Sequence, residues 1–227
     1  MICRDFNCLY VHVPKTGGQS IEQFFMNRLH LDWDRDRSAL HLQSNDDPAL
    51  GTEKLAHLSA AEYVDCGHLG PEEFSGFYKF SFVRNPWSRI LSEYRYRNYF
   101  HHFSFRDFVL NKMPRLGWDD KYRHVMPQYD MLYDSQGKLL VDYVGRFETL
   151  QEDFNRVCQT LGISDSELPH RNKSDKKSRD LKRTIRNLVF MNGENRYSSM
   201  AEFYDDETRD AVAEYYQKDI ETFGYRF

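Results

Sequence analysis

Apolar and polar positions along the chain predict strands and helices in alternation. Residues 8–13 form a short β-branched and aromatic run that ends at Pro14, as a buried strand does, and apolar positions then recur at helical spacing over 20–31. The same order is predicted again, with a strand over 77–83 and a helix that begins at Pro86. Proline fits the first position of a helix, because the N–H there has no partner within the helix. A third strand over 138–147 precedes one apolar helix face at 150, 154, 157, 158 and 161.

Strands that alternate with helices indicate an α/β protein with a central, mostly parallel sheet flanked by helices on both faces. Further helices are expected over 55–64 and near the C-terminus, and the polar segment 32–52 is expected to be a surface excursion. No internal repeat, linker or low-complexity tract interrupts the pattern. We therefore expect one domain that comprises residues 1–227.

Composition places the chain among soluble globular proteins, since 40% of its 227 residues are hydrophobic and 29% are charged. No apolar run approaches the roughly 20 residues that span a bilayer, and Arg4 and Asp5 stand where a signal peptide needs apolar residues. The expected location is cytoplasmic; a lumenal catalytic domain without its anchor is the alternative. The four cysteines lack metal-site spacing and are expected to be reduced thiols.

The net charge of −4 argues against a nucleic-acid-binding protein. Charge is uneven, however, because residues 170–186 carry eight Lys or Arg against two Asp. This basic segment indicates either an anionic ligand or a solvated loop and helix face, and charge alone does not separate the two. Oligomeric state is likewise open.

A first chemical motif, Pro-Lys-Thr-Gly-Gly-Gln-Ser at 14–20, joins the first predicted strand to its helix. Glycines let backbone N–H groups crowd around an anion, the helix N-terminus adds partial positive charge, and Lys15 adds a full one. The lysine precedes the glycines, so the loop is not the Walker A motif of ATPases. A simple Gly-Gly turn between strand and helix is the alternative interpretation.

A second motif, Arg-Asn-Pro-Trp-Ser-Arg-Ile-Leu-Ser-Glu-Tyr at 84–94, follows the second strand. Arg84 stands at the carboxyl end of that strand, where open α/β sheets bind ligands, and Ser92 lies about two turns into the next helix. Both side chains could reach one phosphate. Arg89 and Glu93, four residues apart, are expected to form a surface pair.

Together, PKTGGQS and FVRNPWSRILSEY resemble the sulfotransferase family, and more narrowly its carbohydrate O-sulfotransferase, or family 2, group. The resemblance continues in HVMPQY (124–129), VDYVGRFETLQEDF (141–154) and LPHRNKS (168–174), so it covers most of the chain. The fold that it implies is a P-loop-like three-layer α/β/α arrangement.

The resemblance implies a donor co-substrate, 3′-phosphoadenosine 5′-phosphosulfate (PAPS), and in-line transfer of its sulfuryl group to a hydroxyl acceptor, expected to be a carbohydrate. Lys15 would stabilise the leaving phosphate, and Arg84 with Ser92 would hold the 3′-phosphate. The basic segment around Arg171 and Lys173 resembles the loop that closes over the nucleotide. The residues expected to cradle the 5′-phosphosulfate are Lys15, Thr16, Gly17, Gly18, Gln19 and Ser20.

The acceptor hydroxyl needs a base, and histidine offers a pKa near neutrality without special tuning. His57 lies where related sequences carry a histidine before the second motif and is the first candidate. His68, in CGHLG, resembles a Gly-His placement in other relatives, whereas His124 and Gln128 are expected to line the acceptor cleft. The mechanism requires no metal, and the sequence shows no tight His/Asp/Glu cluster to hold one.

Two other classes of function are compatible with parts of the pattern. A nucleotide-dependent small-molecule kinase would share the sheet and an anion loop, although the Walker lysine and a strand-end aspartate for Mg²⁺ are missing. A non-catalytic module that binds nucleotides or polyanions would use the basic segment at 170–186.

Overall fold

The computed structural model describes residues 1–169 and 199–227, so the predicted donor residues Arg171 and Lys173 lie outside the described part. Its sheet has the strand order β1 (Ile2–Cys3), β2 (Cys8–Val11), β3 (Tyr78–Val83) and β4 (Tyr143–Arg146). Strands β2, β3 and β4 are parallel, whereas β1 pairs antiparallel with β2. The three predicted strands and their parallel arrangement are confirmed, although β4 is shorter than the strand predicted over 138–147. The short edge strand β1 was not expected.

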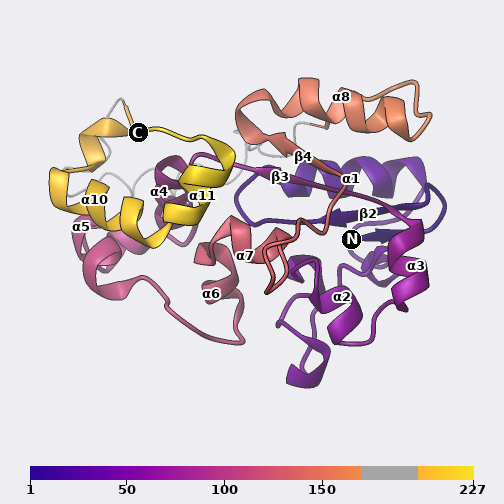
Figure 1. Cartoon of the computed structure of the whole chain (residues 1–227), viewed down its shortest axis with the longest axis horizontal. Coiled ribbons are helices and arrows are strands. Elements are labelled where there is room, and N and C mark those ends of the chain that lie inside the picture. The colour runs from indigo at the N-terminus through magenta and orange to yellow at the C-terminus, as the bar shows by residue number, and fades with distance from the viewer. Residues whose placement is uncertain (170–198) are drawn as a thin grey trace, which may run out of the picture.

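Helices cover both faces of this sheet (Figure 1). On one face, α1 (Gly18–Arg28) and α8 (Leu150–Thr160) bury Phe24, Phe25 and Phe154 against Tyr10 and Phe80 of the strands. The opposite face is covered by α2 (Glu62–Asp65), α3 (Pro71–Gly76) and α7 (Gln128–Leu132). These layers confirm the predicted α/β fold with a mostly parallel sheet between helices.

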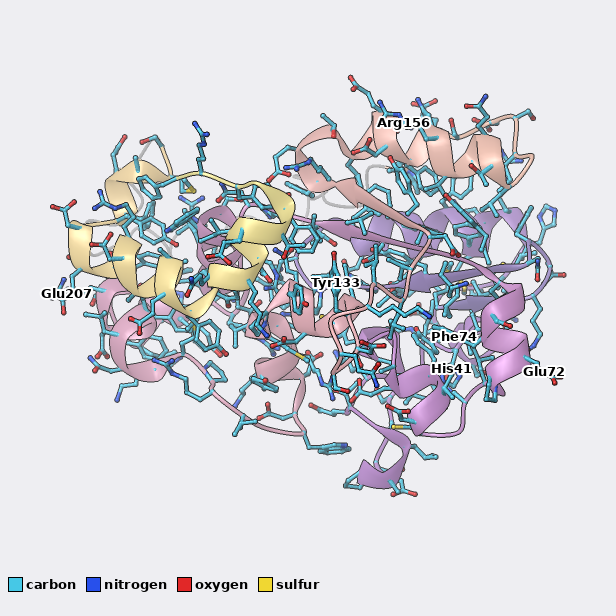
Figure 2. All side chains as sticks on the ribbon, in the orientation of Figure 1. His41, Glu72, Phe74, Tyr133, Arg156 and Glu207 are labelled. Atoms are coloured by element: carbon cyan, nitrogen blue, oxygen red, sulfur yellow. The ribbon has the colours of Figure 1, made fainter. Side chains whose placement is uncertain are left out.

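A separate cluster of helices lies beyond the end of β3. It comprises α4 (Pro86–Tyr96), α5 (Phe105–Asp107), the π-helical turn η5 (Phe108–Lys112), α10 (Asp206–Tyr215) and α11 (Gln217–Phe223). Its core contains Trp87, Tyr94, Phe108 and Tyr216. Exposed charges such as Glu207 on α10, Arg156 on α8 and Glu72 on α3 point outward (Figure 2).

Shorter elements carry the chain across the sheet ends. They are α6 (Asp120–Val125) and the 3₁₀ turns η1 (Arg37–Leu40), η2 (Pro48–Leu50), η3 (Leu55–His57), η4 (Tyr99–His101), η6 (Phe147–Thr149) and η8 (Ala201–Phe203). Among the described residues, no helix is both long and apolar enough to cross a bilayer.

The expected single helix over 55–64 is wrong, because it is divided into η3 and α2. The cause is a capping exchange between Ser59 and Glu62: the Ser59 N–H donates to Glu62 Oε2 at 2.8 Å, and the Glu62 N–H donates to Ser59 Oγ at 3.4 Å. The chain therefore restarts a helix at Glu62. His57 is left at the end of a 3₁₀ turn.

Candidate active site

The loop after β2 turns sharply and presents the N-terminus of α1. Lys15 (φ 73°) and Gly17 (φ 85°) adopt left-handed conformations, and the Thr16 hydroxyl donates to the Val13 carbonyl at 2.7 Å. A left-handed conformation costs a residue such as lysine about 1–2 kcal/mol. A Cβ at Gly17 would also lie 2.7 Å from Leu150 Cδ2. Within residues 1–169 and 199–227, no side chain caps α1, so its first N–H groups are available to an anion.

Lys15 adds a cation to this helix end. Its Nζ lies 3.5 Å from the centroid of the Tyr96 ring, and that ring is half exposed. Burial lowers the pKa of Lys15 to about 8, and the nearby guanidinium groups of Arg84 and Arg97 lower it further, partly offset by Glu93. Cations that crowd a buried amine favour the binding of an anion beside it.

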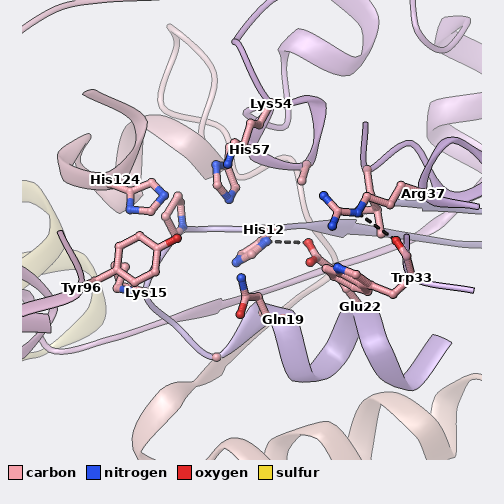
Figure 3. Close-up of a pocket in the computed structure, with 15 residues that line it drawn as sticks. His12, Lys15, Gln19, Glu22, Trp33, Arg37, Lys54, His57, Tyr96 and His124 are labelled. Carbon is pink, nitrogen blue, oxygen red and sulfur yellow. Dashed lines mark hydrogen bonds and ion pairs between the residues drawn. The ribbon is translucent and has the colours of Figure 1, made fainter. Parts of the chain in front are cut away.

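A pocket opens over this loop, with Lys15, Gln19 and His12 on the side of the loop and His57 and His124 on the other side (Figure 3). Trp33, Arg37 and Leu42 also line it. The segment 32–52, expected to be a surface excursion, therefore contributes a wall of the pocket. The other residues that line the pocket are Pro14, Gly17, Gly18, Glu22, Lys54, Ala56 and Tyr96.

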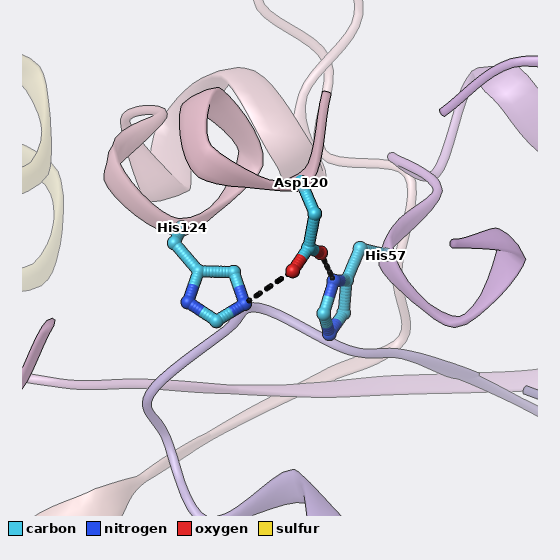
Figure 4. A group of neighbouring side chains, drawn as sticks. All are labelled: His57, Asp120 and His124. Atoms are coloured by element: carbon cyan, nitrogen blue, oxygen red, sulfur yellow. Dashed lines mark hydrogen bonds and ion pairs between the residues drawn. The ribbon is translucent and has the colours of Figure 1, made fainter. Parts of the chain in front are cut away.

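His57 and His124 share one carboxylate at this pocket (Figure 4). His57 Nδ1 lies 2.6 Å from Asp120 Oδ1, and His124 Nε2 lies 3.4 Å from Asp120 Oδ2. His124 Nδ1 is in turn 2.6 Å from Glu93 Oε2. Asp120 accepts a hydrogen bond from the Nδ1–H of His57. The lone pair of the neutral ring is therefore on Nε2, at the opposite edge of the ring.

The expectation of a histidine that titrates near neutrality is wrong for His57. Burial lowers its pKa to about 4, against the raising effect of the hydrogen bond to Asp120. Burial opposes ionisation of Asp120, but the contacts with His57 and His124 bring its pKa well below the ordinary value. His57 is thus neutral at physiological pH. The ionised Asp120 carboxylate beside it would stabilise the imidazolium if His57 accepted a proton.

The ligand atoms of His57, Asp120 and His124 lie within 4.8 Å of one another, close enough to hold a metal ion, although no such cluster was evident from the sequence. However, Arg97 NH2 lies 3.0 Å from Asp120 Oδ2, and Lys54 Nζ lies 3.9 Å from the same oxygen. These cations already balance the carboxylate and would repel a metal ion. The contacts are those of a hydrogen-bonded network.

A second cleft lies at the end of β3 and contains both predicted 3′-phosphate residues. Arg84 and Ser92 line it together with Ser88, Arg95 and Ser199. Arg84 Nε donates to Ser88 Oγ at 2.8 Å and Arg84 NH1 to the Lys15 carbonyl at 3.1 Å, so the guanidinium connects the two loops. Burial lowers the pKa of Arg84 to about 10, which leaves it charged at neutral pH.

The predicted surface pair of Arg89 and Glu93 is wrong, because both side chains are buried. Arg89 donates to the carbonyls of Pro14, Met126 and His124 at 2.9–3.1 Å and so ties the loop after β2 to α6. An i, i+4 spacing indicates which residues share a helix face but not whether that face is exposed.

Two predicted site residues lie away from the pocket. His68 Nε2 is 2.8 Å from the Leu50 carbonyl, and its ring packs against His41. Gln128 is fully buried, accepts from the Arg84 N–H at 2.8 Å and donates to the Arg84 carbonyl at 2.9 Å. Its amide therefore holds the end of β3 rather than lining the acceptor cleft.

Comparison with known proteins agrees with this arrangement. The chain matches the Sulfotransferase family over residues 1–226, and it therefore belongs to that family. It is 34% identical over 99 residues to an uncharacterized protein of Archaeoglobus fulgidus, an alignment that covers 42% of this chain and 76% of that protein. No solved structure matches the chain significantly. Family membership makes the protein a transferase of sulfuryl groups and implies a sulfonate donor.

Proposed function

We propose that the protein transfers the sulfuryl group of PAPS to a hydroxyl of a carbohydrate. The observation that carries this proposal is the convergence of an uncapped helix N-terminus, Lys15 and a carboxylate-bound histidine on one pocket. The first two suit the phosphosulfate, and the histidine suits the hydroxyl that attacks it.

The donor would lie across both strand ends. Its 5′-phosphosulfate would take the N–H groups of Gly17 and Gly18 and the ammonium of Lys15, with the rest of the loop through Ser20 around it. Its 3′-phosphate would bind Arg84 and Ser92 in the second cleft. The bond between Arg84 and the Lys15 carbonyl supports this division, since it fixes the spacing of the two anion sites.

Transfer would be an in-line displacement at sulfur. The acceptor oxygen forms a bond to sulfur while the bond from sulfur to the bridging phosphate oxygen breaks, and the acceptor proton moves to His57 Nε2. Asp120 orients the imidazole and stabilises its charge. Lys15 stabilises the negative charge that develops on the leaving phosphate. Positioning and charge stabilisation are the main demands of such a reaction.

The walls of the pocket support a sugar acceptor. Trp33 and Tyr96 place aromatic rings in the pocket wall, where Arg37 lies over the Trp33 ring and the half-exposed Tyr96 ring stacks on His124 with centroids 5.5 Å apart. Lys54, Arg37 and Gln19 supply polar groups between them. A ligand site with aromatic surfaces and a few placed polar groups suits a ring that has C–H faces and hydroxyl edges.

The donor assignment is tested by titrating the protein with adenosine 3′,5′-bisphosphate (PAP), ADP and ATP without Mg²⁺, and following the thermal midpoint. A ligand that binds the folded state raises the midpoint, and we expect a selective rise with PAP. A rise with ATP and Mg²⁺ alone would instead indicate a kinase. In Arg84→Ala the affinity for PAP should fall far more than that for ADP.

Catalysis is separated from binding by Lys15→Ala. The enzyme should lose PAPS turnover in this variant, whereas a non-catalytic binding module would show no turnover to lose. Turnover is measured as PAP released from PAPS with a panel of neutral and acidic oligosaccharides. Sulfation of simple alcohols and phenols but of no oligosaccharide would contradict the carbohydrate acceptor while leaving the donor assignment in place.

A further inference from the structure

A third imidazole–carboxylate pair, besides His57–Asp120 and His124–Glu93, lies beneath the loop and is not used in the transfer described above. His12 follows β2, and Glu22 lies in α1. His12 Nδ1 lies 2.6 Å from Glu22 Oε1. Both residues are buried, with exposed fractions of 5% for His12 and 3% for Glu22. Both also line the pocket that contains Lys15 and His57. A buried ionisable pair in a reaction pocket calls for a chemical explanation.

The position of the His12 ring is narrowly fixed. Glu22 holds the Nδ1 edge, and the Nε2 edge lies against the start of α1: a Cβ added at Gly18 would be 2.1 Å from His12 Nε2. The ring centroids of His12 and His57 are 4.9 Å apart. Figure 3 shows the His12 ring between Glu22 on one side and the Lys15 and Tyr96 side chains on the other. A group bound between the loop and His57 therefore has His12 beside it.

The Glu22 carboxylate stays ionised although it is buried. Burial opposes ionisation of Glu22, but the charge and hydrogen bond of His12 bring its pKa below the ordinary value. A buried carboxylate that stays ionised stabilises the imidazolium bonded to it. The other groups around the pair are Tyr10, stacked on His12, with His57 and the Met1 amine. An imidazolium held at Nδ1 by Glu22 presents its second N–H from Nε2.

We infer that His12 is a further catalytic residue, whose Nε2–H donates a hydrogen bond to an oxygen of the sulfuryl group while that group moves to the acceptor. The inference rests on the proposed function. Lys15 serves the leaving phosphate and His57 the attacking hydroxyl, and His12 serves the group between them. The acceptor proton still passes to His57, the sulfur–oxygen bonds exchange as above, and His12 keeps both of its protons.

Two substitutions at position 12 separate this role from a structural one. In His12→Asn the amide nitrogen reaches about as far as Nδ1, so it can donate to Glu22 but offers nothing at the position of Nε2. In His12→Gln the amide nitrogen reaches about as far as Nε2. The assays are PAP release from PAPS with water as acceptor, which needs no identified sugar, and the affinity for PAP.

We expect His12→Asn to lower kcat roughly 10²-fold, the loss typical of one transition-state hydrogen-bond donor, with PAP affinity unchanged within about twofold. His12→Gln should recover at least about tenfold of that loss. A structural role through Glu22 predicts the reverse order, with Asn tolerated and Gln damaging. That order, equal losses, or full activity of His12→Asn would overturn the inference.

The wild-type protein distinguishes the failure of this inference from the failure of the proposed function. Wild type that neither binds PAP nor consumes PAPS overturns both, whereas an active wild type with indifferent variants overturns only the role of His12. If the variants do not fold, imidazole ¹⁵N resonances of the wild type decide. Inorganic sulfate added to the PAP-bound protein should shift the Nε2 resonance of His12, and an unmoved resonance contradicts the contact.

Discussion

His57–Asp120 and His12–Glu22 are alike in geometry and differ in what surrounds the carboxylate. Both pairs place Nδ1 2.6 Å from a carboxylate oxygen, and both rings line one pocket. Asp120 is also bonded by Arg97 at 3.0 Å, and Lys54 and His124 lie close to it. In the described part of the chain, the hydrogen bond to the Glu22 carboxylate comes from His12.

This difference is the basis of the opposite tasks that we propose for the two histidines. Where a guanidinium already balances the carboxylate, burial dominates and the imidazole stays neutral, with a pKa of about 4 for His57. Where the carboxylate has the imidazole as its partner, in the His12–Glu22 pair, the role proposed above uses the charged imidazole. A neutral histidine accepts a proton, and a charged one donates hydrogen bonds to an anion. In this proposal, the surroundings of the carboxylate distinguish the base from the donor, since the two contact distances are the same.

The largest expected effect belongs to the base. His57→Ala should lower turnover by roughly 10²-fold or more, because the attacking hydroxyl loses its proton acceptor, and should leave PAP affinity nearly unchanged. The measurement is PAP release from PAPS together with PAP binding. His68→Ala is the matched control, since that ring contacts the Leu50 carbonyl and His41 and should leave turnover unaffected. An active His57→Ala beside an inactive His68→Ala would reverse the two assignments.

The partner of the base should matter next. Asp120→Asn removes the charge that stabilises the His57 imidazolium, so turnover should fall roughly tenfold or more. PAP affinity and the thermal midpoint report separately on folding, because Asp120 also contacts Arg97 and Lys54. Turnover that survives the substitution would show that the carboxylate serves only to anchor those cations.

Gly18 tests how closely His12 is packed against the loop. In Gly18→Ala the new methyl group would lie 2.1 Å from His12 Nε2, so either the ring or the start of α1 must move. We expect PAP affinity to fall about tenfold, the loss of one charge-assisted hydrogen bond to phosphate. Gly70→Ala is the control, because nothing lies within 4 Å of its added Cβ. Equal affinities in the two variants would contradict the close packing.

The two halves of the pocket differ in how far the sequence predicts them. The loop from Lys15 to Ser20 is contiguous and lies between a strand pattern and a helix pattern, so its position at the sheet edge could be predicted. Asp120 is 63 positions from His57, and nothing local indicates that the two meet. Glu22 is only 10 positions from His12, but one acidic residue in a helix carries no signal of burial. Pairing across elements depends on packing, which periodicity does not encode.

Residues 32–52 are mostly exposed, as expected of a surface excursion, and three of them also line the pocket. Trp33 and Arg37 stand in a polar segment rich in aspartate, which is typical of a solvent-exposed loop. The segment nevertheless folds back over the pocket, because Leu40 and Leu42 are buried with the cluster around α1. These 21 positions contain three leucines, and their spacing does not indicate that Leu40 and Leu42 make that contact. Which residues of such a loop form the pocket wall is therefore visible only in the structure.

The final expected effect, equal in size to that of Gly18→Ala, extends the comparison to Lys15, because burial lowers the pKa of this residue to about 8. A bound anion favours the charged amine and raises this pKa again, so PAP should bind best below about pH 8 and less well above it. With a pKa of about 8 in the free protein, affinity should fall roughly tenfold between about pH 7 and about pH 9. Lys15→Arg, which stays charged throughout, should bind PAP equally at both values. Arg84, with a pKa of about 10, stays mostly protonated over this interval. Calorimetric titration with PAP measures the slope. A wild-type affinity as flat as that of Lys15→Arg would mean that Lys15 keeps its charge despite burial, and that burial alone does not set the charge state of the groups in this pocket.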